Sequence, residues 1–409
     1  MPFEFAPSAS PETLRQRAAL LSFTRRFFEQ HGYLEVETPL LSPDIVVDTH
    51  LEPFSTRFRP DPTSGRGTEL FLQTSPEFSL KRLLTAGVGP VFEVFRAFRN
   101  GEAGMRHNPE FSLIEWYRPG DTHHDQMAFT EEFVRGVFRE AARFPSGSPS
   151  RSPSPLGLGV RGKGCDHGHI DHFTGPSASQ EQRPQEARES SGHPLTPGPS
   201  PREEGKRMVL NIDEPFERLT YDEAFARFAG TKVQHLPVAA LADLAGSGGV
   251  SVPAGFAIDE SARDEWLNLL LAELVEPHLG RDRPAFLYDY PASQAALAVI
   301  RHDDPPVAER FELYIDGIEL CNGYHELLDA NELRCRNTEQ NAKRAALGLR
   351  TLPADSRLLA AMDHGLPACS GVALGFDRLL MVVLDKSSIG DVRAFLTEGT
   401  EIEEQGTGW

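Results

Sequence analysis

The stretch over residues 92–119, FEVFRAFRNGEAGMRHNPEFSLIEWYRP, constrains the fold of this chain more than any other. An apolar run leads to Arg99, and Asn100-Gly101 then predicts a turn. Apolar and aromatic residues resume at Phe111 and predict a buried return strand. Two strands joined in this way can hold a nucleotide between an aromatic ring and an arginine. They can equally form an ordinary hairpin with a solvated tip, and the stretch alone does not separate the two interpretations.

The composition of the chain suits a soluble globular protein. Its 409 residues allow one large domain or two ordinary ones, with 39% hydrophobic and 25% charged residues. The sequence contains no apolar run of the roughly 18 residues that a membrane span needs, and no secretory leader. Four scattered cysteines fit a reducing compartment, so we expect a cytoplasmic protein. The net charge of -19 argues against broad, unspecific binding to nucleic acids, although it allows one local basic groove.

Local signals predict helices and strands in irregular succession. Ser10-Pro11-Glu12 is typical of a helix start, with a serine cap, a proline and an acid in the first turn. Residues 33–39 predict a strand that ends at a proline. Asp316-Gly317 between two apolar runs predicts a hairpin, and a helix is expected over about 331–347. Runs of strands with few βαβ alternations indicate an α+β fold with an antiparallel sheet flanked by helices.

Residues 145–206 differ in composition from the rest of the chain. They are rich in proline, serine and glycine, and they contain too few apolar residues to form a packed core. We predict a disordered surface insert that separates a first part of the domain, 1–144, from a second part, 207–409. The insert contains one cysteine and three histidines with a spacing that resembles a metal site. Without a flanking core we interpret them as incidental: Cys165, His167, His169 and His172.

Three segments carry a resemblance to a known family. FRNGEAGMRHNPEF (98–111) contains an arginine and an aromatic residue, GIELCNGYHEL (317–327) contains acids and an asparagine, and GVALGFDR (371–378) places an arginine at a helix start. In this order, behind the strand that ends at Pro39, they resemble the three motifs of class II aminoacyl-tRNA synthetases. The resemblance implies a catalytic domain and a homodimer with the Pro39 segment in the interface. An ordinary helix-strand packing unit fits that segment equally well.

Within this class the sequence is similar to lysyl-tRNA synthetases, and three features favour a stand-alone branch that ligates β-lysine to elongation factor P. The chain starts almost directly at the first motif, which leaves no room for an N-terminal anticodon-binding OB domain. EWYRP (115–119) and YDYPASQAALA (288–298) are similar to this branch. Ser75 and Ala373 stand where the tRNA synthetases typically have Ala and Gly, and both would reshape the pocket for an amine on the β carbon.

The resemblance implies a role for each matching residue. Arg99 and Arg378 would be catalytic and bind the phosphates. The ATP site would comprise Arg99, Asn100, Gly101, Asn108, Phe111, Glu319, Leu320, Gly375 and Arg378. The amino acid would be bound by Ser75, Pro76, Glu77, Glu115, Tyr117, Asn322, Glu326 and Ala373. Mg²⁺, a hard cation that takes oxygen ligands, would be bound by Glu312 and Glu319. Taken singly these residues have plainer roles; Glu77, for example, can simply complement a helix dipole.

The implied reaction is an ATP-dependent ligation in two steps. The substrate carboxylate attacks the α-phosphorus of ATP and pyrophosphate leaves; a lysine amine of elongation factor P then takes the acyl group and AMP leaves. Three acids in one pocket suit a diamino acid, so we expect (R)-β-lysine, with neither tRNA nor a membrane as partner. Two alternatives stay open, a truncated lysyl-tRNA synthetase that charges tRNA and a non-catalytic regulator.

One residue departs from the family pattern. The second motif typically runs Arg-Asn-Glu-Glu, and here Gly101 replaces the first glutamate. A glycine cannot make that side-chain contact with ATP, unless the loop shifts so that Glu102 substitutes.

Overall fold

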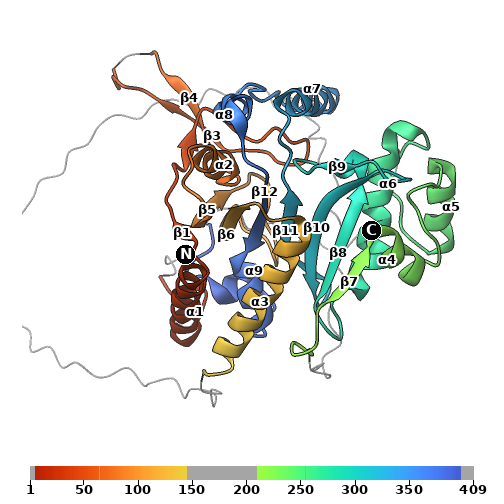
Figure 1. The fold of residues 1–409 in the computed structure, drawn as a ribbon, viewed down its shortest axis with the longest axis horizontal. Helices are drawn as coiled ribbons and strands as arrows, with labels where there is room; N and C mark the ends of the chain where they lie inside the picture. Colours follow the sequence, from red (N-terminus) through yellow and green to blue (C-terminus); the bar gives the residue numbers. More distant parts are fainter. Residues whose placement is uncertain (1–4, 64, 145–209, 254, 398–409) are drawn as a thin grey trace, which may run out of the picture. The chain divides into compact units, whose positions relative to one another are not determined.

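A computed structural model describes residues 5–63, 65–144, 210–253 and 255–397 of the chain (Figure 1). The predicted insert at 145–206, with Cys165 and its neighbouring histidines, lies outside the described residues. The division into a first and a second part of one domain therefore stays a prediction. Among the described helices, none is both long and apolar enough to cross a membrane.

A nine-stranded sheet forms the centre of the described structure. Neighbouring strands are antiparallel from β5 to β8, so the predicted antiparallel sheet is confirmed for the six central strands. The outermost pairs, β1–β5 and β7–β8, are parallel, which makes the whole sheet mixed. In spatial order the strands are β1 (Leu34–Glu35), β5 (Val91–Phe98), β6 (Glu110–Pro119), β12 (Cys369–Gly375), β11 (Ile318–His325), β10 (Val307–Ile315), β8 (Ala285–Pro291) and β7 (Glu217–Thr220). The short β9 (Ile300–Arg301) pairs with β10, and a separate small sheet contains β2 (Leu41–Ser42), β4 (Thr68–Leu72) and β3 (Ser55–Phe58).

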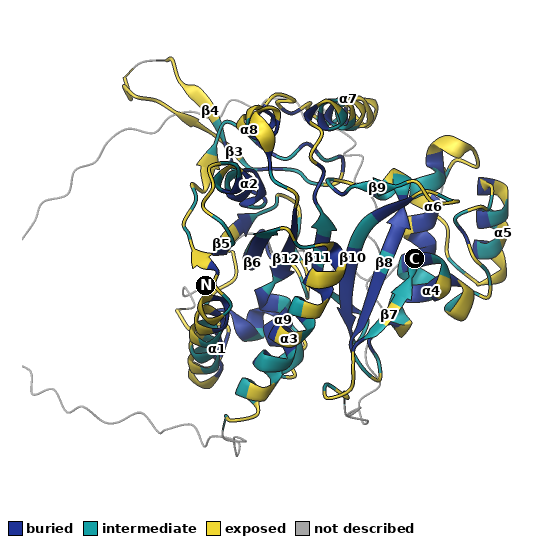
Figure 2. Cartoon of the chain, in the orientation of Figure 1, coloured by how far each residue is buried: buried dark blue, intermediate teal, exposed yellow. Residues whose placement is uncertain are grey.

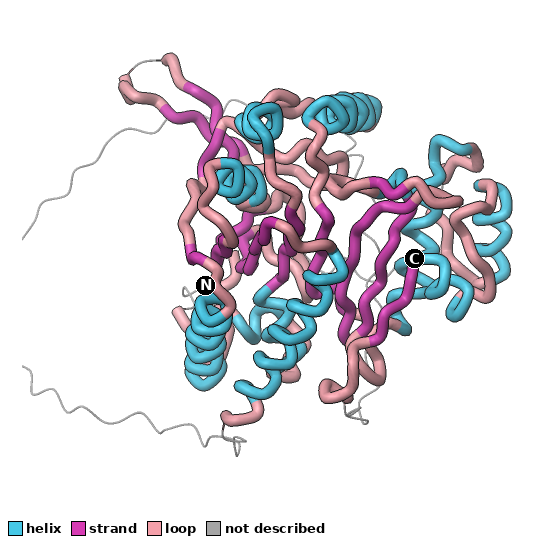
Figure 3. Tube along the Cα trace, in the orientation of Figure 1, coloured by secondary structure: helices cyan, strands magenta, loops and turns pink. Residues whose placement is uncertain are grey.

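One face of the large sheet is covered by helices over its central strands. These are α1 (Pro11–Gln30), α3 (His123–Ala141) and α9 (Phe376–Val383), with α1 and α3 side by side (Figures 1 and 3). Their apolar side chains pack with alternate residues of the central strands, among them Trp116, Phe311 and Val372, in the largest core cluster. Figure 2 shows the central strands as buried and the outer sides of the helices as exposed.

The opposite face of the sheet is covered only at its two ends. At one end lie α2 (Glu77–Thr85), α7 (Ala330–Ala346) and α8 (Arg357–Gly365), which pack with Val91 and Tyr117. At the other end lie α4 (Tyr221–Phe228), α5 (Val238–Ser247), α6 (Arg263–Leu270) and the π-helical turn Leu271–Val275, which pack with Leu287 and Tyr314. In the described part of the chain, the sheet residues between these two covers are half-buried or buried, and they form the candidate site.

Several local predictions are confirmed, and one is too long. The Ser10 hydroxyl caps α1 by accepting a hydrogen bond from the Thr13 amide at 3.1 Å. Asp316 and Gly317 both have positive φ, as a tight two-residue hairpin turn requires. The predicted strand at 33–39 pairs only over Leu34–Glu35. The Val36 amide still donates to the Phe92 carbonyl, and beyond it the Thr38 amide donates to a carboxylate oxygen of Glu93 instead of to a neighbouring strand.

Candidate active site

A single row of the sheet collects predicted residues from three distant segments. Glu312 on β10 is paired with Asn322 on β11, Asn322 with Ala373 on β12, and Ala373 with Glu115 on β6. Residues directly opposite each other in antiparallel strands project from the same face. The register therefore places all four side chains on the half-open face between the two helical covers. Half-buried Asn322 and Ala373 lie in the middle of this row.

The amino-acid side of the site is a buried group of acids around one lysine. Glu77 is the first residue of α2, and Lys81 follows one turn later. The Lys81 ammonium lies 2.5 Å from Oε1 of Glu77 and 2.5 Å from Oε2 of Glu326. The other oxygen of Glu326, Oε1, is buried and has no hydrogen-bond partner among the described residues. Lys81 therefore fixes two of the predicted substrate-binding acids and leaves one oxygen available to a ligand.

The third acid, Glu115, is held by two hydroxyl groups. The Ser75 hydroxyl lies 3.0 and 2.8 Å from the two carboxylate oxygens, and the Tyr117 hydroxyl donates to Oε1 at 2.8 Å. The Tyr117 ring lies flat against β12, because Gly371 opposite it has no Cβ; a Cβ there would approach the ring to 2.1 Å. The Ser75 hydroxyl also accepts from the backbone amide of Glu77 at 3.0 Å, so one serine contacts both the Glu115 carboxylate and the start of α2.

Burial alters the protonation of these groups. Burial and the charge of Glu77 raise the pKa of Glu115 to about 8, against the lowering effect of the Tyr117 and Ser75 hydroxyls. Burial also raises the pKa of Glu326 to about 8, although the nearby Lys81 ammonium opposes this. Burial alone would lower the pKa of Lys81, but the charges of Glu326 and Glu77 raise it above its usual value. At neutral pH Glu115 and Glu326 therefore retain protons that a bound cation would displace.

The nucleotide side of the site centres on the loop between β5 and β6. The Arg99 guanidinium lies over the Phe111 ring, 5.0 Å from its centroid, and its Nη1 is 3.4 Å from Oε1 of Glu102. Gly101 has φ +86°, a backbone conformation that glycine adopts without strain. The carboxylate that reaches Arg99 is thus that of Glu102, one residue beyond the position where the family typically has its first glutamate.

Arg378, in the first turn of α9, connects this loop to β11. Its Nη2 lies 2.6 Å from Nε2 of His107, and its Nη1 lies 3.1 Å from the Glu319 carbonyl and 3.3 Å from Oε2 of Glu319. Desolvation of the His107 ring and the charge of Arg378 lower the pKa of His107 to about 4. His107 is therefore neutral near pH 7 and accepts a hydrogen bond from Arg378. Both predicted catalytic arginines thus contact residues of the loop between β5 and β6, Arg99 through Glu102 and Arg378 through His107.

The predicted metal ligands lie in a cluster of acids beside Arg378. Oε2 of Glu312 accepts hydrogen bonds of 2.6 Å from Tyr290 and Tyr314, and its Oε1 lies 2.5 Å from Nη2 of Arg310. Burial and the charge of Glu312 raise the pKa of Glu319, and burial with the charges of Glu312 and Glu319 raises that of Glu276 to about 7. A divalent cation would relieve this repulsion, so the residues fit Mg²⁺. Glu319 is placed for direct contact, whereas both oxygens of Glu312 already have partners.

Asn108 is the predicted residue whose side chain turns away from the site. Its amide donates to the Glu110 carbonyl at 2.6 Å, lies 3.0 Å from the Thr397 hydroxyl and accepts from the Thr397 amide at 3.1 Å. This side chain therefore holds the loop to the segment after α9. Pro76 precedes α2, Gly375 ends β12 directly before α9, and Asn100 forms a β-bridge with Glu52. The Leu320 side chain, by contrast, is buried in the core cluster on the helix-covered face of the sheet.

Some residues of the site were not predicted, among them Lys81, Arg310, His107 and Glu276. Lys81 follows Glu77 by four positions, a spacing that places two side chains on one helix face, and this signal was available in the sequence. Arg310 precedes Glu312 by two positions, which places both on one strand face. His107 lies inside the segment 98–111, but no local pattern predicts its contact with Arg378.

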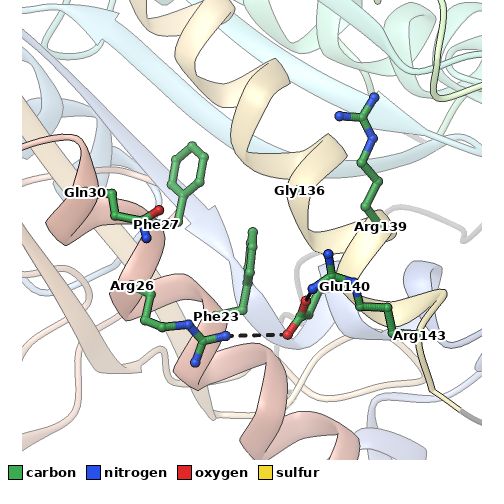
Figure 4. A pocket seen from close by; sticks show the side chains of 8 residues that line it. All are labelled: Phe23, Arg26, Phe27, Gln30, Gly136, Arg139, Glu140 and Arg143. Carbon is green, nitrogen blue, oxygen red and sulfur yellow. Dashed lines mark hydrogen bonds and ion pairs between the residues drawn. The ribbon is translucent and has the colours of Figure 1, made fainter.

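A separate hollow of about 300 Å³ lies between α1 and α3 (Figure 4). Its lining includes Phe23, Phe27 and the ion pair between Arg26 and Glu140, at 3.4 Å. None of the predicted site residues lines it. It lies on the covered face of the sheet, so it is distinct from the candidate active site.

The site combines an antiparallel sheet, an arginine in a β-hairpin loop, a second arginine at a helix start and acids between the two arginines. This combination defines the catalytic domain of a class II synthetase. The chain belongs to the family described as tRNA synthetases class II (D, K and N), whose family model matches residues 5–398. It is 40% identical to proteins named elongation factor P–(R)-β-lysine ligase from Klebsiella pneumoniae and from Salmonella dublin. Each match extends over 398 residues and covers 96% of this chain and 97% of the relative.

Proposed function

We propose that this chain is an ATP-dependent ligase that activates (R)-β-lysine as an acyl-adenylate and transfers it to a lysine side chain of elongation factor P. The names of relatives that match nearly the full chain support this proposal. The observation that carries it is the buried pocket formed by Glu77, Glu115 and Glu326 around Lys81.

The charges of the pocket suit a diamino acid. When ionised, three carboxylates and one ammonium leave two negative charges, which the two ammonium groups of a β-lysine would neutralise. Oε1 of Glu326 has no partner among the described residues, and Glu115 is oriented by two hydroxyls, so both acids are prepared to accept hydrogen bonds. An acidic or neutral amino acid would leave buried charges unpaired and would be rejected.

In the first step the substrate carboxylate attacks the α-phosphorus of ATP. A bond forms between the carboxylate oxygen and phosphorus, the bond to the bridging oxygen breaks, and pyrophosphate leaves. Asn322, in the middle of the row, would orient the carboxylate, and Arg99 would bind the α-phosphate. Arg378, held by His107 and Glu319, would bind the distal phosphates. These residues position groups and neutralise charge, and none forms a covalent bond.

In the second step an amine of the acceptor protein attacks the acyl carbon, an amide forms and AMP leaves. Adenine would stack on Phe111, whose ring already contacts the Arg99 guanidinium. Mg²⁺ would be held by Glu319 directly and by Glu312 after exchange of one of its present partners. Bound there, the ion would neutralise phosphate charge.

Two residues are expected to set the preference for β-lysine over α-lysine. Ser75 contacts Glu115 and Glu77, and Ala373 lies opposite both Glu115 and Asn322, so each touches groups that would bind the amines or the carboxylate. We also propose a homodimer in which the first motif, with α1, forms the interface. Transfer to tRNA is not part of the proposal.

Parallel adenylation assays with (R)-β-lysine and α-lysine, followed by acceptor assays, test the proposal. We expect pyrophosphate exchange with β-lysine and labelling of elongation factor P. Preference for α-lysine with charging of tRNA would favour a truncated lysyl-tRNA synthetase. No exchange with any diamino acid would favour a non-catalytic regulator.

A further inference from the structure

A second cluster of potential ligands lies on the opposite face of the sheet from the active site. His123 begins α3, Glu309 lies on β10 and His325 lies on β11. Successive residues of a strand point to opposite faces, so His325 projects away from the face that carries Asn322 and Tyr324. In the part of the chain that the structure describes, this is the group of at least three His, Cys, Asp or Glu residues whose ligand atoms all lie within 4.8 Å of one another.

The three side chains converge on one carboxylate oxygen. Oε2 of Glu309 lies 2.5 Å from Nδ1 of His325 and 3.9 Å from Nδ1 of His123. The other oxygen, Oε1, is 3.4 Å from Nη1 of Arg301, which also pairs with Asp289. Arg301 therefore orients the Glu309 carboxylate and leaves Oε2 to the two histidines. Ligand groups in metal sites are commonly fixed by such outer contacts.

The two ring nitrogens of His123 make no hydrogen bond in the described structure that would explain why this side chain is buried. It is 2% exposed, and neither ring nitrogen has a hydrogen-bond partner among the described residues. Buried polar groups are rarely left without a partner, because the loss of hydration costs free energy. Imidazole nitrogens are common metal ligands in proteins, and a bound ion would give the His123 ring the partner that it lacks among the described residues.

We propose that His123, Glu309 and His325 bind a divalent transition-metal ion, with Zn²⁺ as the best fit. Two imidazole nitrogens and one carboxylate oxygen are a ligand set that zinc takes in proteins, whereas Mg²⁺ and Ca²⁺ prefer oxygen ligands alone. Binding would replace the direct contact between Nδ1 of His325 and Oε2 of Glu309 with bonds from both atoms to the ion. The side chains of His325 and Glu309 are 27% and 15% exposed, so an ion can enter from their side.

The site would join three elements that the fold only packs together. A metal bound by these residues links the start of α3 to β10 and β11. Strand β11 and the bridge that follows it also carry Asn322 and Glu326, on either side of His325 in the sequence. Metal binding on one face of β11 would therefore stabilise the strand that positions the substrate on the other face.

Calorimetric titration of the full chain with ZnCl₂, after removal of metals by chelation, tests this site. An excess of MgCl₂ is present throughout to saturate the carboxylates of the active site. We expect one bound equivalent of Zn²⁺ to be lost in His325→Gln, and an affinity at least about ten-fold weaker in Glu309→Gln. His124→Gln is the matched control, because His124 is adjacent and exposed but does not belong to the cluster.

Comparison of variants separates this site from other metal-binding groups of the chain. Zinc that binds elsewhere, for example at Cys165 and its neighbouring histidines, is retained in His325→Gln. Identical isotherms for the wild type, His325→Gln and Glu309→Gln would overturn the proposal, as would no zinc binding at all or a loss confined to His124→Gln. Co²⁺ bound to the wild type gives a second readout that does not depend on variant stability, since imidazole ligation changes its visible spectrum. A spectrum of fully hydrated Co²⁺ would also overturn the proposal.

Discussion

Nζ of Lys81 lies 2.5 Å from Oε2 of Glu326, and both side chains are almost completely buried. The same ammonium reaches Glu77 on its own helix. One lysine therefore holds together two acids that are separated by most of the chain and that we assign to substrate binding.

Replacement of Lys81 tests how strongly this pair supports the fold. Lys81→Met would leave Glu77 and Glu326 buried without their counter-charge, and we expect the free energy of unfolding to fall by about 3 kcal/mol or more. Urea denaturation measures it. Lys343→Met, on the exposed side of α7, is the matched control and should change the stability by less than about 0.5 kcal/mol. Equal effects of the two substitutions would contradict the assigned role of Lys81.

The raised pKa of Glu115, about 8, predicts a pH dependence of substrate binding. Below pH 8 the carboxyl is mostly protonated, whereas the substrate's side-chain amine stays charged up to about pH 10. We therefore expect KM for the diamino acid to fall as pH rises from 6.5 to 8, by up to about ten-fold per unit. KM for ATP should not show this fall between pH 6.5 and 8. Glu115→Gln should weaken binding and flatten the profile; an unchanged profile would argue against Glu115.

The same shift predicts a change in stability with pH. The pKa of Glu115 is higher in the folded protein than its ordinary value of 4.5, so folding favours the protonated form. This contribution is complete below about pH 4.5 and is lost as pH rises through about 8. The difference in unfolding free energy between the wild type and Glu115→Gln should therefore shift against the wild type between pH 5 and 8. A constant difference would contradict the raised pKa.

The contact between Arg378 and His107 predicts separable kinetic effects. Arg378→Lys removes the planar guanidinium, whose several N–H groups can donate to phosphates and to His107 at the same time. We therefore expect pyrophosphate exchange to slow by about 100-fold or more. His107→Ala removes only a contact that positions Arg378, so a smaller rise in KM for ATP is expected, about three- to ten-fold. The matched control is Arg334→Lys, whose guanidinium pairs with Asp363 at the surface. Equal losses for Arg378→Lys and Arg334→Lys would indicate a general effect on folding.

Substitution of Ser75 and Ala373 should change the preference of the enzyme for β-lysine over α-lysine. Ser75→Ala with Ala373→Gly removes the hydroxyl that orients Glu115 and opens space beside Asn322. We expect the ratio of kcat/KM for β-lysine to that for α-lysine to fall by about ten-fold or more, which corresponds to roughly 1.4 kcal/mol. A ratio that does not change would place the determinants of selectivity elsewhere.

Much of the fold follows from short-range patterns, whereas the site depends on register. The cap at Ser10 and the turn at Asp316-Gly317 are local, and the structure confirms both. The row Glu312, Asn322, Ala373 and Glu115 could be assigned only by resemblance, because register across four strands is a tertiary property. The parallel pairing of the predicted strand at 33–39 with β5 was missed for the same reason, and the four-residue strand β7 was missed because it is too short to carry a pattern. His107 was missed because its contact with Arg378 spans 271 positions.

The most direct test of the proposed function is the intact mass of elongation factor P after incubation with this chain, ATP, Mg²⁺ and (R)-β-lysine. We predict that one lysine side chain of the acceptor gains the mass of β-lysine minus water, and that the gain requires ATP and is lost with Arg99→Lys. An unmodified acceptor, together with α-lysine charged to tRNA by the same preparation, would contradict the proposal.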